Sequence, residues 1–305
     1  MTRPLLLLGL TLLLSACAGR PIALPDPEQL THLPPRILLD DVPFHAQDDY
    51  QCGPAALAMT LQQRGLGDTP ESLVDRVYIP ERQGSLQVEM VAAARERDLL
   101  VYPLERNLES ILYELAAGNP VLVMQNLAFN FAPQWHYAVV VGYDLPQQTL
   151  LVHSGLNEAQ KEPFQLFMRT WDRADRWARV IMPPDRLPAT AEALPFLRAA
   201  SDLEQTRRLD AAAMAYRTAL QRWPEQPAAR LGLGNIAWSS NRPRDAETEL
   251  RKLVSEHPGL GAGWNNLSVV LDHLGCNAAA AQARQCALDA GTTATATPCP
   301  VPTCP

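Results

Sequence analysis

Two residues in this chain have the type and setting for chemistry, a cysteine at the start of an expected helix and a histidine at the start of an expected strand. Cys52 is followed by Gly53, Pro54 and an apolar run, which predicts a buried helix beginning at the cysteine. There the helix macrodipole and unpaired backbone N–H groups favour thiolate over thiol. We expect Cys52 to be a nucleophile; the alternative is an inert buried cysteine.

The expected base is His136, which stands near the start of the apolar run 135–143. An imidazole titrates near neutral pH, so it can take a proton from a thiol and later give it to a leaving amine. A core histidine without a catalytic role is the alternative interpretation, and His45 and His153 are competing candidates.

The oxyanion that forms when a thiolate attacks an amide carbonyl needs fixed hydrogen-bond donors, typically worth about 3 kcal/mol of barrier. Gln47, upstream of the cysteine, is expected to supply a side-chain N–H. The backbone N–H of Cys52 is expected to be the second donor. Gln51 is adjacent to Cys52 and is expected to point elsewhere.

These residues need a scaffold of helices followed by strands. Apolar spacing, caps and breakers predict helices over 52–64, 69–77, 85–97 and 107–118 and a short strand at 100–102. The pattern then changes to strands over 120–124, 135–143 and 149–153, an edge strand over 164–168 and a helix over 170–177. Residues 36–183 are therefore predicted to form an α+β domain.

Beyond a Pro- and Ala-rich linker over 184–195, the chain is predicted to be all-α over 196–291. Pro224 and Pro258 lie 34 residues apart, each after an amphipathic segment, and small residues recur in phase with them. This period resembles the tetratricopeptide repeat, with two clear repeats and a partial one near 194–224. An unrelated helical bundle is the alternative.

The N-terminus predicts export. Residues 1–16 combine one positive charge, an apolar run and small residues before Cys17, as in a secretory signal peptide. The sequence Leu-Ser-Ala-Cys at 14–17 resembles the bacterial lipobox, which implies acylation of Cys17 and a tether over 17–35. Ala18 implies sorting to the periplasmic face of the outer membrane. An ordinary cleaved signal is the alternative.

Composition excludes other classes of function. The formal net charge is -7 and basic residues form no cluster along the sequence, which argues against nucleic acid as a partner. No cysteine pair has zinc-ligand spacing, so neither a metal nor a cofactor is expected.

The four C-terminal cysteines are expected to form disulfides, most simply Cys276–Cys286 and Cys299–Cys304, with a disordered tail over 292–305.

Residues 40–155 together resemble the C39-like, bacteriocin-processing family of papain-like cysteine peptidases. The resemblance implies the roles given above to Cys52, His136 and Gln47, although Gln47 precedes the cysteine by five residues where such enzymes usually have six. The family orients its histidine with an aspartate on the next strand, but residues 152–155 read Val-His-Ser-Gly. Ser154 is the candidate in its place, with His153 and Asn126 as alternatives.

The sequence thus predicts an exported, lipid-anchored cysteine peptidase that hydrolyses peptide bonds through a thiolate–imidazolium pair. The papain-like α+β domain is expected to cut a protein or peptide, and the tetratricopeptide helices to bind a protein partner or substrate. Contact with the membrane is expected through the lipid alone. Two alternatives are a catalytically degenerate envelope scaffold and acyl transfer on a non-peptide amide.

Overall fold

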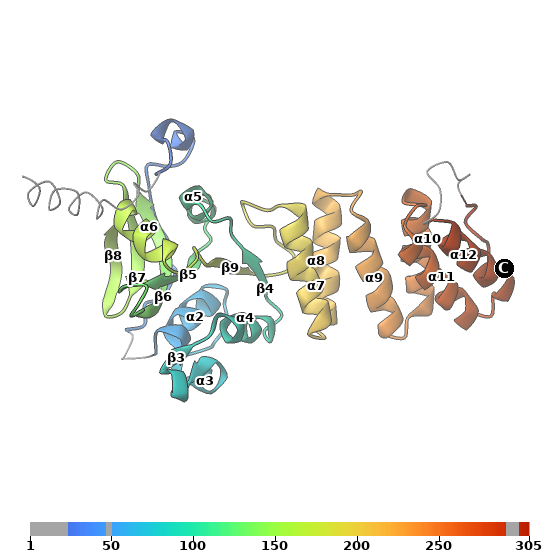
Figure 1. Ribbon diagram of the computed structural model, residues 1–305, viewed down its shortest axis with the longest axis horizontal. Helices are drawn as coiled ribbons and strands as arrows, with labels where there is room; N and C mark the ends of the chain where they lie inside the picture. The colour runs from blue at the N-terminus through green and yellow to red at the C-terminus, as the bar shows by residue number, and fades with distance from the viewer. Residues whose placement is uncertain (1–23, 47–50, 291–298, 305) are drawn as a thin grey trace, which may run out of the picture.

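The computed structural model describes residues 24–46, 51–290 and 299–304. The positions expected for lipidation and for the oxyanion hole, Cys17 and Gln47, lie outside the described residues, as does the signal segment. An α+β domain occupies one end of the molecule and a row of helices extends from it (Figure 1).

Among the described residues of the α+β domain, the larger of two sheets has seven antiparallel strands. Its main order is β4 (Leu100–Pro103), β9 (Ala178–Met182), β5 (Val121–Asn126), β6 (Trp135–Asp144), β7 (Thr149–Ser154) and β8 (Asn157–Pro163). The strand β1 (Arg36–Leu38) pairs with the C-terminal end of β6. Each neighbouring pair is antiparallel, as expected for an α+β domain.

Helices cover both faces of this sheet (Figure 1). On one face lie α2 (Cys52–Gln63), α3 (Pro70–Val77) and α4 (Gln87–Arg95), and on the other α5 (Leu108–Ala116) and α6 (Phe164–Asp172). The alternation of β6 divides its side chains between two cores. Tyr137 and Val139 pack with α2, whereas Ala138 and Val140 pack with α5 and α6. The sheet therefore holds the N-terminus of α2 against the start of β6.

Local signals fix the helix boundaries. The Thr69 side chain caps α3 and the Asn107 side chain caps α5 by accepting the Ser110 N–H at 2.8 Å. Gly65, with φ +84°, follows α2. The helix expected from residue 85 begins at residue 87 instead, because β2 (Tyr78–Ile79) and β3 (Gly84–Ser85) form a small hairpin, joined by a 3₁₀ turn, before it.

The prediction of an edge strand over 164–168 and a helix over 170–177 is wrong. Residues 157–163 form the edge strand β8 and residues 164–172 form α6. The strand is mostly exposed and polar, so it has no apolar alternation that could reveal it. Phe164, Phe167 and Trp171 are buried at helical spacing, on the face of α6 that packs on the sheet.

The C-terminal region consists of three helical hairpins in the described residues. They are formed by α7 (Ala193–Gln205) with α8 (Leu209–Arg222), α9 (Pro227–Ser239) with α10 (Pro243–Glu256), and α11 (Gly261–His273) with α12 (Asn277–Asp289). The all-helical architecture is as predicted, and the first hairpin is complete rather than partial. Trp264 and Leu267 are fully buried between neighbouring helices.

The segment expected to be a linker is packed against both regions. One hydrophobic core continues from the sheet residues Leu100 and Tyr102 into Phe196 of α7. The fully buried carboxylate of Glu114 accepts hydrogen bonds from the backbone N–H groups of Ala189 and Thr190 at 3.1 and 2.8 Å. The first hairpin is thus attached to the α+β domain.

The expected disulfide pairing is wrong. Cys276 bonds to Cys304, and Cys286 bonds to Cys299. Cys276 immediately precedes α12 and Cys286 lies near the end of this helix. Ten helical residues rise about 15 Å, which is too far for a disulfide. Residues 299–304, expected to belong to a disordered tail, are instead bonded to this helix.

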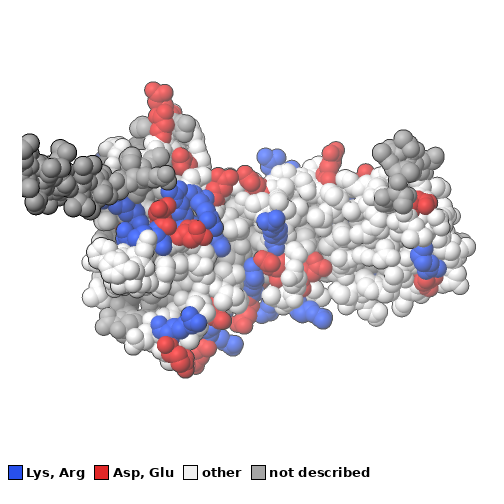
Figure 2. Space-filling model, viewed as in Figure 1, with Lys and Arg blue, Asp and Glu red and all other residues white. Residues whose placement is uncertain are grey.

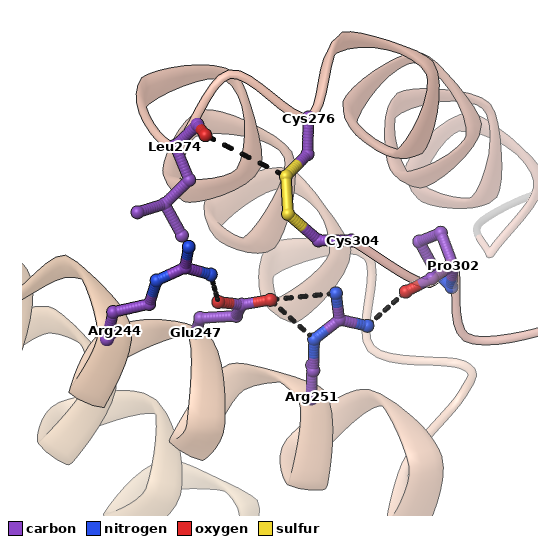
Figure 3. The surroundings of a disulfide bond; sticks show 7 residues. All are labelled: Arg244, Glu247, Arg251, Leu274, Cys276, Pro302 and Cys304. Atoms are coloured by element: carbon purple, nitrogen blue, oxygen red, sulfur yellow. Dashed lines mark hydrogen bonds and ion pairs between the residues drawn. A yellow bond between two sulfur atoms is a disulfide. The ribbon is translucent and has the colours of Figure 1, made fainter.

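Contacts from the repeats also hold the C-terminal segment. Figure 3 shows Arg251, which donates to the Pro302 carbonyl and pairs with Glu247 at 2.8 Å.

Near the other end of the chain, Leu30 of the expected tether is buried in the sheet core, and His32 stacks on Tyr113. No helix in the described part of the chain combines the length and apolar character needed to cross a bilayer.

Candidate active site

The half-buried Cys52 is the first residue of α2, at the end of the sheet where β6 begins. Gly53 allows this placement. A Cβ at that position would lie 2.1 Å from the Ser85 Oγ and 2.6 Å from its Cβ. The glycine therefore lets β3 pack directly against the first turn of α2, beside the thiol.

Two opposing effects act on the Cys52 thiol. Burial raises its pKa, while backbone N–H groups of Tyr137, Gly53 and Cys52 itself lower that pKa. Burial is the larger effect, so the net pKa lies above the ordinary value for cysteine. The contribution of Tyr137 shows that the sulfur lies beside β6, at the residue that follows His136.

His136 is half-buried on β6, and its Nε2 lies 2.9 Å from the Ser154 Oγ on β7. When Nε2 carries the proton it donates to this hydroxyl, and the lone pair of Nδ1 remains available as a base. Burial lowers the pKa of His136 to about 4. The imidazole is therefore uncharged at neutral pH.

Burial acts against the charges of the expected thiolate–imidazolium pair. A raised thiol pKa and a lowered imidazole pKa both favour the uncharged forms of the two groups. The physical cause is that burial disfavours each charge and that Ser154 is a neutral partner. A carboxylate in the place of Ser154 would stabilise the imidazolium.

The competing candidates have other partners. His153 is buried, with Nδ1 accepting the Ala159 N–H at 3.0 Å and Nε2 lying 3.2 Å from the Val42 carbonyl. His45 lies 2.9 Å from the Gln62 side chain. The side-chain oxygen of Asn126 accepts backbone N–H groups of the loop that follows it. These contacts tie all three side chains to the scaffold.

A cavity of about 310 Å³ opens at the same end of the sheet. Met124 and Trp177 line it, and both belong to the face that carries Tyr137. The rings of Tyr137 and Trp177 meet edge to face with centroids 5.8 Å apart. Trp135, which precedes His136, is 52% exposed and also lines the cavity. The cavity-lining residue Trp177 thus contacts the ring of Tyr137, whose backbone lies beside the Cys52 sulfur.

Sequence reasoning missed the side chains that line this cavity. They come from β4 and the segment after it, the start of α4, the ends of β5 and β6, the turn after α6, and β9. Such a set has no local sequence pattern. The one available signal is the occurrence of three arginines between residues 173 and 179, and the neighbouring Asp172 and Asp175 keep it from standing out as a basic cluster.

Comparison with known proteins agrees with the two-part architecture. Residues 39–178 match the model of the Peptidase_C39 like family, and residues 197–260 and 233–294 match a tetratricopeptide repeat model. A search of curated proteins finds no match.

Two solved structures are similar to part of this chain at low identity. A Bacillus anthracis protein described as a C39-like peptidase is 18% identical, with a TM-score of 0.40, over 48% of this chain and 97% of that one. A double glycine motif protease from an AMS/PCAT transporter, in complex with the leader peptide, is 20% identical, with a TM-score of 0.35, over 47% of this chain and 91% of that one.

Proposed function

Because the chain carries a C39-like peptidase domain followed by tetratricopeptide repeats, we propose that it is a cysteine peptidase with Cys52 as nucleophile and His136 as general base. The supporting observation is the placement of the thiol at the N-terminus of α2, beside the backbone of Tyr137. His136 precedes that residue and is held by Ser154.

Acylation begins with proton transfer from the Cys52 thiol to Nδ1 of His136. The sulfur attacks the carbonyl carbon of the scissile amide, and a C–S bond forms as the carbonyl oxygen becomes an oxyanion. The Cys52 backbone N–H at the start of α2 and, in this proposal, the Gln47 side chain donate to that oxyanion. The imidazolium then gives its proton to the leaving amine as the C–N bond breaks.

Deacylation uses the same groups in reverse. His136 takes a proton from water, the hydroxide attacks the thioester carbon, and the C–S bond breaks. The imidazolium returns its proton to the sulfur, which restores the thiol and releases a carboxylic acid. Ser154 holds the ring through Nε2 during both steps. Because its hydroxyl is neutral, it stabilises the imidazolium less than a carboxylate would.

The repeats are proposed to bind a protein partner or the substrate itself. Helical hairpins of this kind present an extended surface. A bound chain would be held close to the peptidase domain, because the first hairpin is packed onto the sheet through Glu114 and the shared core.

The proposal includes export and lipid attachment at Cys17. Incorporation of labelled fatty acid in a bacterial host, abolished by Cys17→Ala, tests that part.

The catalytic proposal is tested with a mixture of proteome-derived peptides and the full chain, with cleavage products identified by mass spectrometry. We expect cleavage by the wild type and none by Cys52→Ala or His136→Ala. His32→Ala is the matched control, since His32 stacks on Tyr113 and belongs to no part of the site. Cleavage that persists in Cys52→Ala would contradict the proposal. A wild type that cuts nothing would favour the scaffold alternative.

A further inference from the structure

The cavity beside the candidate active site has an unusual charge balance. Four arginines line it, and they are accompanied there by one carboxylate, that of Asp175. Figure 2 shows basic side chains, with acidic ones among them, gathered on the α+β domain in the area that Figure 1 shows as α6 and its surroundings. The four side chains are Arg106, Arg173, Arg176 and Arg179.

Two of these arginines are engaged by carboxylates. Arg106 pairs with Asp175 at 2.7 Å, and Arg176 pairs with Asp172 at 2.8 Å. Arg176 also donates to the Arg106 carbonyl. These contacts fix the turn after α6 against the segment that follows β4. The charge of both arginines is largely balanced within the protein.

The other two arginines have no carboxylate partner among the described residues. Arg173 donates through Nε and Nη2 to the backbone carbonyl of Asn126, at 3.1 and 2.9 Å. Arg179 lies over the Trp177 ring at 4.8 Å and donates to the Ala178 carbonyl. Neutral carbonyls and a ring orient these guanidinium groups but leave their charges uncompensated.

The partial burial of Arg179 makes its uncompensated charge important for binding an anion. Arg179 is half-buried, and burial together with the nearby Arg95 and Arg106 lowers its pKa to about 10, so it remains charged at neutral pH. A planar guanidinium matches the geometry of a carboxylate and can donate two parallel hydrogen bonds. An anionic group entering the cavity would therefore gain strong hydrogen bonds.

We propose that this cavity is a substrate subsite for the side chain of an aspartate or glutamate, with Arg173 and Arg179 as its anion-binding groups. The inference rests on the proposed peptidase function and gives it a specificity. The volume of about 310 Å³ is at the lower end for ligand pockets, which range from about 300 to 1,000 Å³. Met124 and Trp135 provide apolar walls for the aliphatic part of such a side chain.

The test uses one mixture of random peptides, acetylated and amidated so that terminal charges cannot account for binding. Full-length Cys52→Ala protein is immobilised, and captured peptides are sequenced by mass spectrometry. We expect Asp and Glu to be enriched about tenfold over Asn and Gln at one position, and the enrichment to vanish in Arg173→Gln and Arg179→Gln versions. A parallel mixture with phosphoserine in place of the acids tests whether another anion binds better.

The matched control is Arg169→Gln, because Arg169 is an exposed residue of α6 that does not line the cavity. It removes the same charge and should leave the enrichment intact. An Arg179→Lys variant separates the effect of losing the charge from the effect of misfolding. It keeps the charge and should keep part of the enrichment. Equal loss in the Arg169→Gln control, complete loss in folded Arg179→Lys, or preference for phosphoserine would overturn the proposal.

Digestion of the same mixture by the wild type separates failure of the subsite from failure of the proposed function. Cleavage without preference for acidic residues would leave the peptidase proposal standing and refute the subsite. Capture of acidic peptides by Cys52→Ala without any cleavage by the wild type would refute the peptidase and retain the cavity as a binding site. If the Cys52→Ala protein captures no acidic peptides and the wild type shows no preference for acidic residues in cleavage, the subsite is refuted directly.

Discussion

The Nε2 atom of His136 lies 2.9 Å from the hydroxyl oxygen of Ser154, on the neighbouring strand of the sheet. This contact orients the imidazole without a charge. The pKa of His136 is lowered to about 4 by burial, and a hydroxyl offers the imidazolium little to offset that effect. Burial therefore favours the uncharged forms of the Cys52 thiol and the His136 imidazole.

A carboxylate in place of this hydroxyl should shift the ionisation of the pair. In Ser154→Asp we expect the pKa of His136 to rise by about 1–3 units, because an opposite charge stabilises the imidazolium. The thiolate form should become more populated, and the pH profile of Cys52 alkylation should move toward acid. Ser154→Asn is the matched neutral control and should leave the profile in place. An unshifted Ser154→Asp profile would contradict the role given to this contact.

Replacing Gly53 should strain the start of α2. The added methyl group of Gly53→Ala would overlap Ser85, so we expect a loss of about 1–3 kcal/mol in the free energy of unfolding, measured in urea. The double variant Gly53→Ala/Ser85→Gly removes the clashing atoms and should recover part of that loss. Gly67→Ala is the control, since a Cβ there meets no atom within 4 Å. Equal effects at the two glycines would argue against the close approach.

Stability should fall as the pH falls below the ordinary pKa of histidine. His136 binds a proton at about pH 4 when folded and at about 6.5 when unfolded. The unfolded state thus binds more protons between these values, and its free energy falls relative to the folded state as the solution is acidified. We expect His136→Gln to reduce the acid-induced loss by about 2 kcal/mol, allowing for partial exposure. Parallel stability curves for the two proteins from pH 7 to 4 would contradict this.

The attachment of the repeats should depend on Glu114. Its carboxylate accepts the backbone N–H groups of residues 189 and 190 in a fully buried position. Glu114→Gln would direct an amide N–H toward donors, and we expect a cost of about 1–3 kcal/mol in the free energy of unfolding. Glu109→Gln, on the more exposed side of the same helix, should change it by about 0.5 kcal/mol or less. A negligible change in Glu114→Gln would show that the packed core alone holds the junction.

Elements with strong local signals could be predicted from the sequence. The cap at Asn107, the stop at Gly65 and the apolar run of β6 each lie within a few residues of the element that they define. The strand β8 is exposed and polar, so its pairing with β7 depends on contacts along the sheet rather than on its own pattern. Helix length could have excluded a Cys276–Cys286 bond, because these residues lie at opposite ends of α12, but it leaves two of the three possible pairings open.

The residues of the candidate site also differ in whether the sequence could predict them. Cys52 and His136 could be proposed from short patterns, and Ser154 from its place one strand later. Arg173 and Arg179 could not, because their significance depends on a cavity that six separate parts of the fold enclose. The carboxylates of Asp172 and Asp175 neutralise two of the four arginines, and those pairings exist only after folding.

The most direct test is the rate at which iodoacetamide alkylates Cys52 at pH 7, located by peptide mapping, in the wild type and in His136→Ala. Cys52 is the one free thiol among the described residues, since the other four described cysteines form disulfides. If His136 serves as base for this thiol, the wild type should react at least about tenfold faster than His136→Ala. Equal rates in the two proteins would contradict the assignment of His136 as the base for Cys52.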